Sequence, residues 1–70
     1  MAKAHSEFVI SCFVISSRWD ELDETQHRCF YEQSVVRFGA DVIRQTVNEL
    51  VNAGRLFNVI EYCRDQLPPV

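Results

Sequence analysis

The side chains that could support metal or nucleophilic chemistry in this chain are three cysteines and two histidines, and they are scattered. Cys12, Cys29 and Cys63 lie far apart in the sequence, as do His5 and His27. A structural zinc site needs four such ligands, commonly with pairs only a few residues apart. Because no Cys-x-x-Cys pair occurs, we expect no metal site and no cofactor, and reduced cysteines in the core.

His27 and Cys29 are the one histidine–cysteine pair close enough in sequence to suggest a nucleophile and its base. Residues two apart on a helix point to different faces, so this spacing argues against such a pair. We expect His27 at the surface and Cys29 in the core. The chain also lacks a glycine-rich loop for phosphate, and its carboxylates fall where helix surfaces would carry them. The sequence therefore predicts a protein that is not an enzyme.

The charge of the chain argues against nucleic acid as its main partner. The net charge is −3 and the sequence pI is about 5.2. Binding to duplex DNA relies on clustered Lys and Arg side chains that displace counterions. The six arginines are instead spread along the chain, at positions 18, 28, 37, 44, 55 and 64.

The cysteine count and the most apolar segment both indicate a cytoplasmic protein. Small secreted domains usually carry an even and denser set of cysteines. The apolar run from Phe8 to Ile15 has only about a third to a half of the ~20 residues that a membrane-spanning helix needs. No small-residue cleavage site follows it, as a signal peptide would require. We expect no membrane contact.

Hydrophobic spacing in the second half of the chain predicts two helices joined by a tight turn. The first covers Asp41 to Ala53, with Asp41 as its N-cap and Gly54 in the left-handed position just past its end. The second ends at Pro68-Pro69, because proline cannot continue a helix. Its apolar face comprises Leu56, Val59, Ile60, Cys63 and Leu67.

A further helix is predicted from about Arg18 to Val35 or Val36, with Gly39 just past its end. Ser17, followed three residues later by Asp20, is a weak capping box. Four acidic residues crowd the first turns, where the helix dipole favours negative charge. They are Asp20, Glu21, Asp23 and Glu24. The helix dipole is a local explanation for this acidic cluster. As an exposed patch, the cluster could also bind a basic partner.

The segment EFVISCFVIS, residues 7–16, fits two structures. Its β-branched and aromatic residues suit a strand. One helical face would instead hold Phe8, Val9, Cys12, Phe13 and Ser16. Ile10 and Val14 would then point elsewhere, and an all-round apolar helix must be covered or must offer apolar surface to another protein. The only candidate partner strand, Leu56 to Tyr62, fits a helix better, so we favour the helix.

These elements predict an all-α fold, a small bundle of about four helices, with an α+β fold containing a strand at 7–16 as the alternative. We expect residues 1–70 to form a single small domain and residues 1–6 to be a flexible lead-in. The predicted core consists of Phe8, Phe13, Trp19, Leu22, Phe30, Val47, Leu50, Leu56, Val59, Ile60 and Leu67.

The stretch VNELVNAGRLFNVIEYCRDQLPPV, residues 47–70, resembles the C-terminal half of the bacterial effector-associated domains. The segment VVRFGA, residues 35–40, is similar to one that precedes those helices in some members. The matching positions are Leu50, Val51, Gly54, Arg55, Leu56, Val59, Ile60, Arg64 and Pro68. The resemblance covers about half of the chain. It implies a helical module of the death-like class, a non-enzymatic adaptor whose like domains bind each other and bring effector and sensor together.

Our first hypothesis is a protein–protein interaction module, adaptor-like, that binds a protein partner or itself and recruits or regulates a larger effector. Arg55 is the leading candidate for partner binding, because it lies at the tight turn where the resemblance is strongest. It could equally be a charge that only solvates the turn. The other candidates are Arg64, Asp20, Glu21, Asp23 and Glu24.

The alternative hypothesis is a small stand-alone regulator or inhibitor, of the size that phages often encode, that binds transcription machinery or DNA. A start at Met1 and an end at Val70 would suit a complete short gene product, although a fragment of a larger protein fits as well. VIRQTVNELVNAGRLFNVI looks superficially like a recognition helix and a wing. Arg44 is the only basic residue of that helix, whereas base-reading helices bring several donors.

Overall fold

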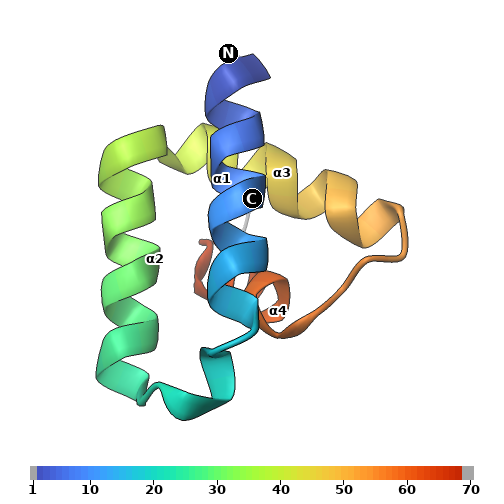
Figure 1. Cartoon of the computed structure of the whole chain (residues 1–70). Helices are drawn as coiled ribbons and strands as arrows, with labels where there is room; N and C mark the ends of the chain where they lie inside the picture. The colour runs from blue at the N-terminus through green and yellow to red at the C-terminus, as the bar shows by residue number, and fades with distance from the viewer. Residues whose placement is uncertain (1, 69–70) are drawn as a thin grey trace.

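Four α-helices and one short 3-10 helix make up residues 2–68, the part of the chain that the computed structural model describes (Figure 1). The elements are α1 (Ala2–Ser16), η1 (Trp19–Glu21), α2 (Glu24–Phe38), α3 (Ala40–Asn52) and α4 (Asn58–Gln66). The prediction of an all-α bundle of about four helices is confirmed. The strand alternative for residues 7–16 is wrong, because this segment lies within α1.

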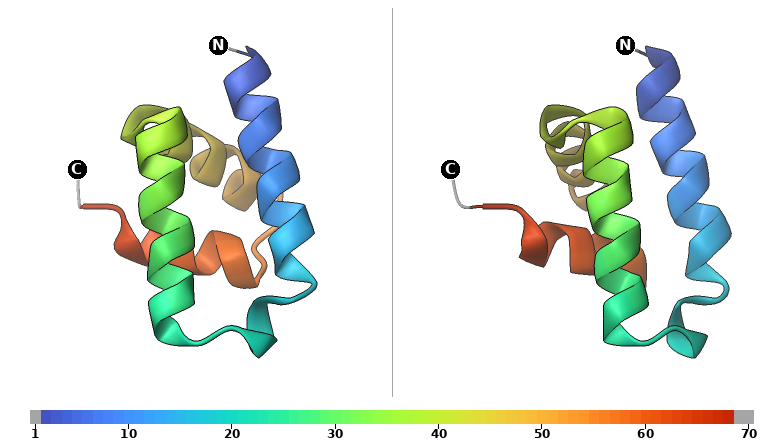
Figure 2. Two further views of the ribbon diagram at one scale, coloured as in Figure 1. Left: turned by 60° about the vertical axis from the view of Figure 1, so that its left-hand side comes forward. Right: turned by 90° about the vertical axis from the view of Figure 1, so that its left-hand side faces the viewer.

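The helices form two groups. α1 and α2 run side by side, and α3 and α4 lie behind them in the view of Figure 1. The turned views of Figure 2 agree with this arrangement. α1 contacts all three other α-helices on its inner side. No other described element crosses the side of α1 that faces the viewer, so this helix is covered on one side only.

The first helix begins earlier than predicted. Residues 2–6, expected as a flexible lead-in, form the first turns of α1, and Met1 lies outside the described residues. His5 ties these turns to α3, since its Nδ1 lies 2.9 Å from the Thr46 hydroxyl and its Nε2 lies 3.3 Å from a Glu49 carboxylate oxygen. A carboxylate can only accept, so Nε2 carries the hydrogen of the contact with Glu49.

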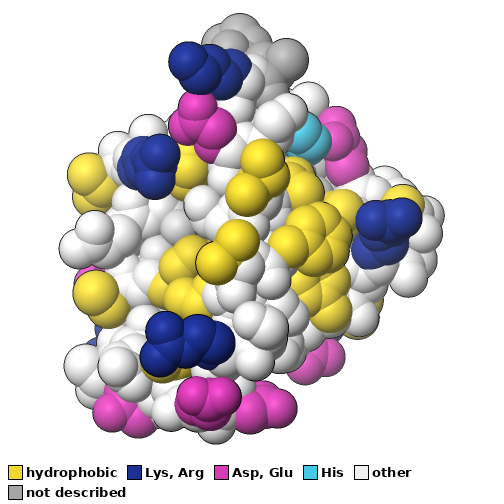
Figure 3. Space-filling model, in the orientation of Figure 1, with side chains coloured by type: hydrophobic (Ala, Val, Ile, Leu, Met, Phe, Trp, Pro, Cys, Tyr) yellow, Lys and Arg dark blue, Asp and Glu magenta, His cyan; other side chains and the backbone are white. Residues whose placement is uncertain are grey.

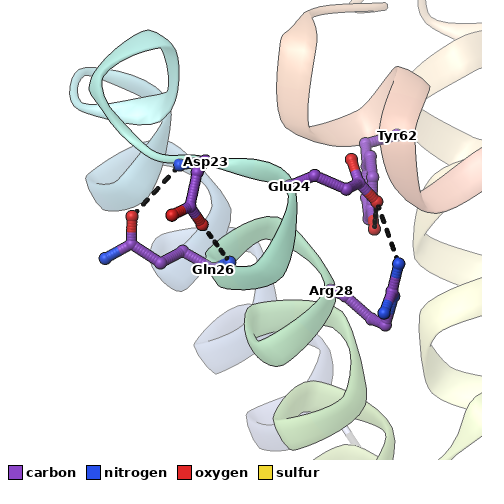
Figure 4. Close-up of polar contacts among 5 residues, drawn as sticks. All are labelled: Asp23, Glu24, Gln26, Arg28 and Tyr62. Carbon is purple, nitrogen blue, oxygen red and sulfur yellow. Dashed lines mark hydrogen bonds and ion pairs between the residues drawn. The ribbon is translucent and has the colours of Figure 1, made fainter.

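The helix predicted from Arg18 is divided into η1 and α2. Asp23, not Ser17, is the N-cap of α2. Its carboxylate accepts the Gln26 backbone N–H at 2.9 Å, and its own N–H donates to the Gln26 side-chain oxygen at 3.1 Å (Figure 4). This is a complete capping box.

The capping box predicted at Ser17 and Asp20 is therefore wrong. The Ser17 hydroxyl instead donates to the Val14 carbonyl at 3.0 Å, at the end of α1. Gln26 at the third helical position can reach back to the cap residue, and the competing site lacks a Glu or Gln there. The chain consequently turns through η1 before α2 begins.

Gly39 joins α2 to α3 with a positive φ of 93°. Its N–H donates to the Val35 carbonyl at 2.9 Å, and its own carbonyl accepts the Ile43 N–H at 3.2 Å. Gly39 thus ends one helix and caps the next. Asp41, predicted as the N-cap of α3, lies in the first helical turn instead.

Gly54 ends α3 as predicted, with a φ of 76°. The Gly54 N–H donates to the Val51 carbonyl at 3.0 Å, and the Arg55 N–H donates to the Leu50 carbonyl at 2.8 Å. These two bonds are the pair that defines a Schellman motif. α4 ends at Gln66, before Pro68; Pro69 and Val70 lie outside the described residues.

The buried hydrophobic residues form one cluster between the helices. It comprises Phe8, Cys12, Trp19, Ile43, Val47, Val59, Ile60 and Cys63. Five of the predicted core residues belong to this cluster. Four more pack against it while partly exposed, namely Leu22, Phe30, Leu50 and Leu67.

Two predicted core residues, Phe13 and Leu56, are 45% and 44% exposed, so these two predictions are wrong. Phe13 lies on the uncovered side of α1 and stacks on Phe57, with ring centroids 5.1 Å apart. Leu56 lies in the connection before α4, which begins only at Asn58, so it does not extend the apolar face of that helix.

Candidate interaction surface

The predicted positions of His27 at the surface and Cys29 in the core are both wrong. Cys29 is exposed, whereas His27 is half-buried against Trp19. The two rings stack with centroids 3.9 Å apart and an interplanar angle of 6°, and His27 Nε2 donates to the Trp19 carbonyl at 2.9 Å. The 3-10 turn brings Trp19 over the start of α2, which gives His27 a packing role.

Cys12 and Cys63 are buried free thiols. Burial raises the pKa of Cys63 from 9.0 to about 12. Burial, together with the neighbouring Cys63, raises the pKa of Cys12 as well. Both side chains therefore stay protonated at neutral pH, where a thiol is a poor nucleophile and a poor metal ligand.

Neither a metal cluster nor a membrane-spanning helix occurs in the described part of the chain. Between residues 2 and 68, no three or more His, Cys, Asp or Glu side chains gather in a way that could hold a metal ion. The longest helices of this part are also too short to cross a bilayer. Two hollows lie along α2, and both are open to solvent; one of them is lined by Cys29, Glu32, Gln33 and Val36.

The four acidic candidates do not form one free patch. The Asp23 carboxylate is already engaged in the capping box at the start of α2. Glu24 accepts the Tyr62 hydroxyl at 3.1 Å and lies 3.8 Å from Arg28, so it links α2 to α4 (Figure 4). Asp20 and Glu21 are exposed on η1 and make no ion pair or side-chain hydrogen bond with the described residues. Only these last two remain available to a partner.

The basic candidates lie elsewhere. Arg55 is exposed in the connection between α3 and α4, and its backbone closes the Schellman motif. Arg64 lies in the last turn of α4, where its Nε is 3.8 Å from an Asp65 carboxylate oxygen. The η1 turn and the α3–α4 connection are at different edges of the molecule in Figure 1. The six predicted residues are therefore not brought together.

α3 does not present the features of a DNA-reading helix. Its buried side holds Ile43, Thr46 and Val47. Arg44, its only basic residue, donates to the Pro68 carbonyl at 3.0 Å. A base-reading helix needs several exposed donors, and this one has its single guanidinium engaged with the chain's own backbone.

The uncovered side of α1 carries three exposed apolar side chains, and we call these residues the α1 face: Ile10, Phe13 and Val14. Ile10 is 61% exposed and Val14 is 66% exposed. Figure 3 shows hydrophobic side chains gathered over α1 and toward the α3–α4 connection, with charged side chains around them. A contiguous apolar patch with a polar rim is typical of a protein contact site.

Hydrogen bonds next to the α1 face join the end of α1 to the start of α4. The Ser16 hydroxyl donates to the Asn58 side-chain oxygen at 2.8 Å, and the Asn58 side-chain nitrogen donates to the Ser16 carbonyl at 3.3 Å. This reciprocal pair places Phe57 beside Phe13, which it stacks on. The surface thus combines a helix and a fixed connection, which keeps it preformed.

Charged residues border the α1 face at both ends of the helix. Lys3 is exposed in the first turns, where Glu7 also lies 3.5 Å from the guanidinium of Arg37. Arg18 is exposed just past the other end, followed by Asp20 on η1. The rim therefore carries both signs of charge.

Sequence reasoning found part of this surface. The helical interpretation of residues 7–16 already turned Ile10 and Val14 away from the predicted core. Phe13 was missed because a large aromatic residue is normally buried. The available signal was that 10, 13, 14 and 17 share one helical stripe, which separates Phe13 from Phe8 and Cys12.

Comparison of the chain with models of known protein families, with curated proteins and with solved structures found no match. The resemblance of residues 47–70 to the effector-associated domains accordingly stays a prediction.

Proposed function

We propose that this protein is a non-enzymatic protein–protein interaction module that docks through the α1 face. The exposure of Ile10, Phe13 and Val14 on one side of a helix carries the proposal. Apolar surface left in water costs roughly 25 cal/mol per Å² relative to burial. Covering this face with another apolar surface is therefore favourable.

The charged rim supports a specific contact. Side chains of both signs around an apolar centre set the orientation and the association rate of a complex more than its affinity. Lys3 and Arg18 are exposed at opposite ends of the face. Arg55, the leading candidate from the sequence, lies in the connection that borders the face at Phe57. Its proposed role is in this rim.

The adaptor-like part of the proposal comes from the resemblance of residues 47–70 to effector-associated domains. Under this proposal the module recruits or regulates a larger effector protein.

Three variants compared with the wild type test the docking surface. Ile10→Lys and Val14→Lys place a charge on the α1 face, and Val36→Lys places one on α2, where Val36 is 88% exposed and lies outside that face. We expect proteins captured by the tagged wild type to be retained by Val36→Lys. Their yield should fall at least about tenfold with either α1 variant, because a contact at the centre of an interface is worth more than about 1.4 kcal/mol.

Far-UV circular dichroism and the thermal midpoint provide the folding control. All three positions are exposed, so all three variants should remain folded, since surface substitutions usually change stability by less than about 0.5 kcal/mol. Equal capture by all four folded proteins would contradict the proposed docking surface.

A further inference from the structure

We infer that the α1 face binds a second copy of this chain, with the two α1 helices packed antiparallel across a twofold axis. The inference deepens the proposed function and rests on it, because it names the occupant of the same surface. Twofold dimers are the commonest assemblies of soluble proteins, and they require a surface that is complementary to itself. The order of residues along α1 meets that requirement.

One stripe of α1 contains Lys3, Glu7, Ile10 and Val14, and it continues to Arg18 in the turn after the helix. These residues are three or four positions apart, so they follow one side of the helix. The two apolar members lie in the middle of the stripe, and the charged members lie toward its ends. A helix placed on this stripe would bury the middle and leave the ends at the rim.

An antiparallel register about position 12 gives favourable pairs along the whole stripe. Ile10 of one copy then packs on Val14 of the other, and each pair occurs twice. Arg18 comes within reach of Glu7 in the other copy, and Lys3 comes within reach of Glu21, which is exposed on η1. A parallel pair would instead place Lys3 beside Lys3 and Arg18 beside Arg18.

The helix dipole favours the same direction. α1 has no acidic residue in its first turn and no basic residue in its last turn. Its partial charges are therefore not compensated within the helix. Antiparallel packing brings the positive end of each α1 to the negative end of the other.

The available apolar area limits such a dimer to moderate affinity. From their exposed fractions, Ile10, Phe13, Val14 and Leu56 present on the order of 400 Å² of surface, about half of what each side of a standard interface buries. A standard interface buries about 800 Å² per partner, with a polar rim around its apolar centre. The charged ends of the stripe would supply much of the remainder. A dissociation constant in the range of about 1–100 μM is expected for such a contact.

Sedimentation equilibrium from about 10 μM to about 1 mM protein, at about 0.15 M salt, tests the dimer. The weight-average mass of the wild type should rise with concentration, from 8.2 kDa toward twice that value. Ile10→Lys and Val14→Lys should raise the dissociation constant by about 100-fold, because the substituted position occurs twice and each occurrence contributes about tenfold. Val36→Lys should leave the constant unchanged.

A charge exchange tests the antiparallel direction. Lys3→Glu and Glu21→Lys should each weaken the dimer by roughly 3- to 10-fold, since each exposed pair occurs twice. The double variant should restore the wild-type constant. In a parallel dimer Lys3→Glu would only replace one like-charged pair with another, and Glu21→Lys would not compensate for it. A double variant that stays as weak as the single variants would overturn the antiparallel arrangement.

A wild type that stays at 8.2 kDa over the whole range overturns the second-copy inference. So does a dimer that Ile10→Lys and Val14→Lys leave intact. The first of these results is separate from a failure of the proposed function. A monomer whose captured protein is still lost with Ile10→Lys would keep the docking surface and assign it to a different protein.

Discussion

Replacing Phe8 with alanine is expected to remove most of the stability of this protein. Phe8 has no exposed surface, and its ring packs against Phe38 with centroids 5.6 Å apart. A buried Phe→Ala change costs about 3–5 kcal/mol. At about 0.05–0.15 kcal/mol per residue, a chain of 70 residues has a free energy of unfolding of only about 4–10 kcal/mol. Urea unfolding followed by circular dichroism measures the loss.

Phe13→Ala is the matched control, since it removes the same atoms from the same helix five residues further along. Phe13 is half-exposed and keeps only part of its contacts within the protein. The expected loss is below about 1.5 kcal/mol, because much of the Phe13 ring is already in water. Equal losses for the two variants would mean that the inner and outer sides of α1 are wrongly assigned.

Raising the pH above about 9 is expected to destabilise the fold through the two buried thiols. In the unfolded chain a thiol loses its proton near pH 9, whereas burial raises the pKa of Cys63 in the folded protein to about 12 and that of Cys12 also rises. The folded state keeps protons that the unfolded state releases. The stabilisation that the two buried, protonated thiols contribute is therefore complete below pH 9 and is lost as the pH rises toward 12.

The expected size of this effect is about 1.4 kcal/mol for each thiol between about pH 8 and about pH 10, or roughly 3 kcal/mol in total. Urea unfolding at a series of pH values measures it. Cys63→Ala should roughly halve the slope in this window, whatever its effect at neutral pH. Cys29→Ala is the matched control, because it removes a thiol that lies at the surface. A slope that Cys63→Ala leaves unchanged would contradict the assigned burial of Cys63.

The elements that sequence reasoning predicted well are those whose boundaries are set by local chemistry. α3 and α4 have clear apolar faces, and Gly54 supplies the positive φ that the Schellman turn requires. The start of α2 was mistaken because two capping signals compete within ten residues. Asp23 with Gln26 outweighs Ser17 with Asp20, since only Gln26 can return a hydrogen bond to the cap residue.

Features that depend on residues far apart in sequence could not be predicted. The first turns of α1 were expected to be a flexible lead-in, because their partners Thr46 and Glu49 lie more than forty residues away. The burial of His27 depends on η1 folding Trp19 over α2. Glu24, one of the predicted binding residues, is engaged by Tyr62 of α4. The contacts of His5 and Glu24 are long-range, whereas the contact of His27 with Trp19 depends on the η1 turn between these two residues.

Tertiary packing also decides which side of α1 stays exposed. An all-round apolar helix has no amphipathic signal that tells its inner side from its outer side. The packing of α2, α3 and α4 decides this, and it leaves Ile10, Phe13 and Val14 outside. The sequence could predict that such a helix would offer surface to another protein, but it could not identify every residue of that surface.

Methyl NMR on protein labelled at isoleucine and valine tests the central claim most directly. Spectra are compared between the free protein at low concentration and the associated protein, whether formed by a second copy or by a captured partner. We expect the methyl signals of Ile10 and Val14 to shift and broaden, and those of Val36 to stay in place. Shifts at Val36 with unchanged Ile10 and Val14 signals would show that the α1 face is not where this protein binds.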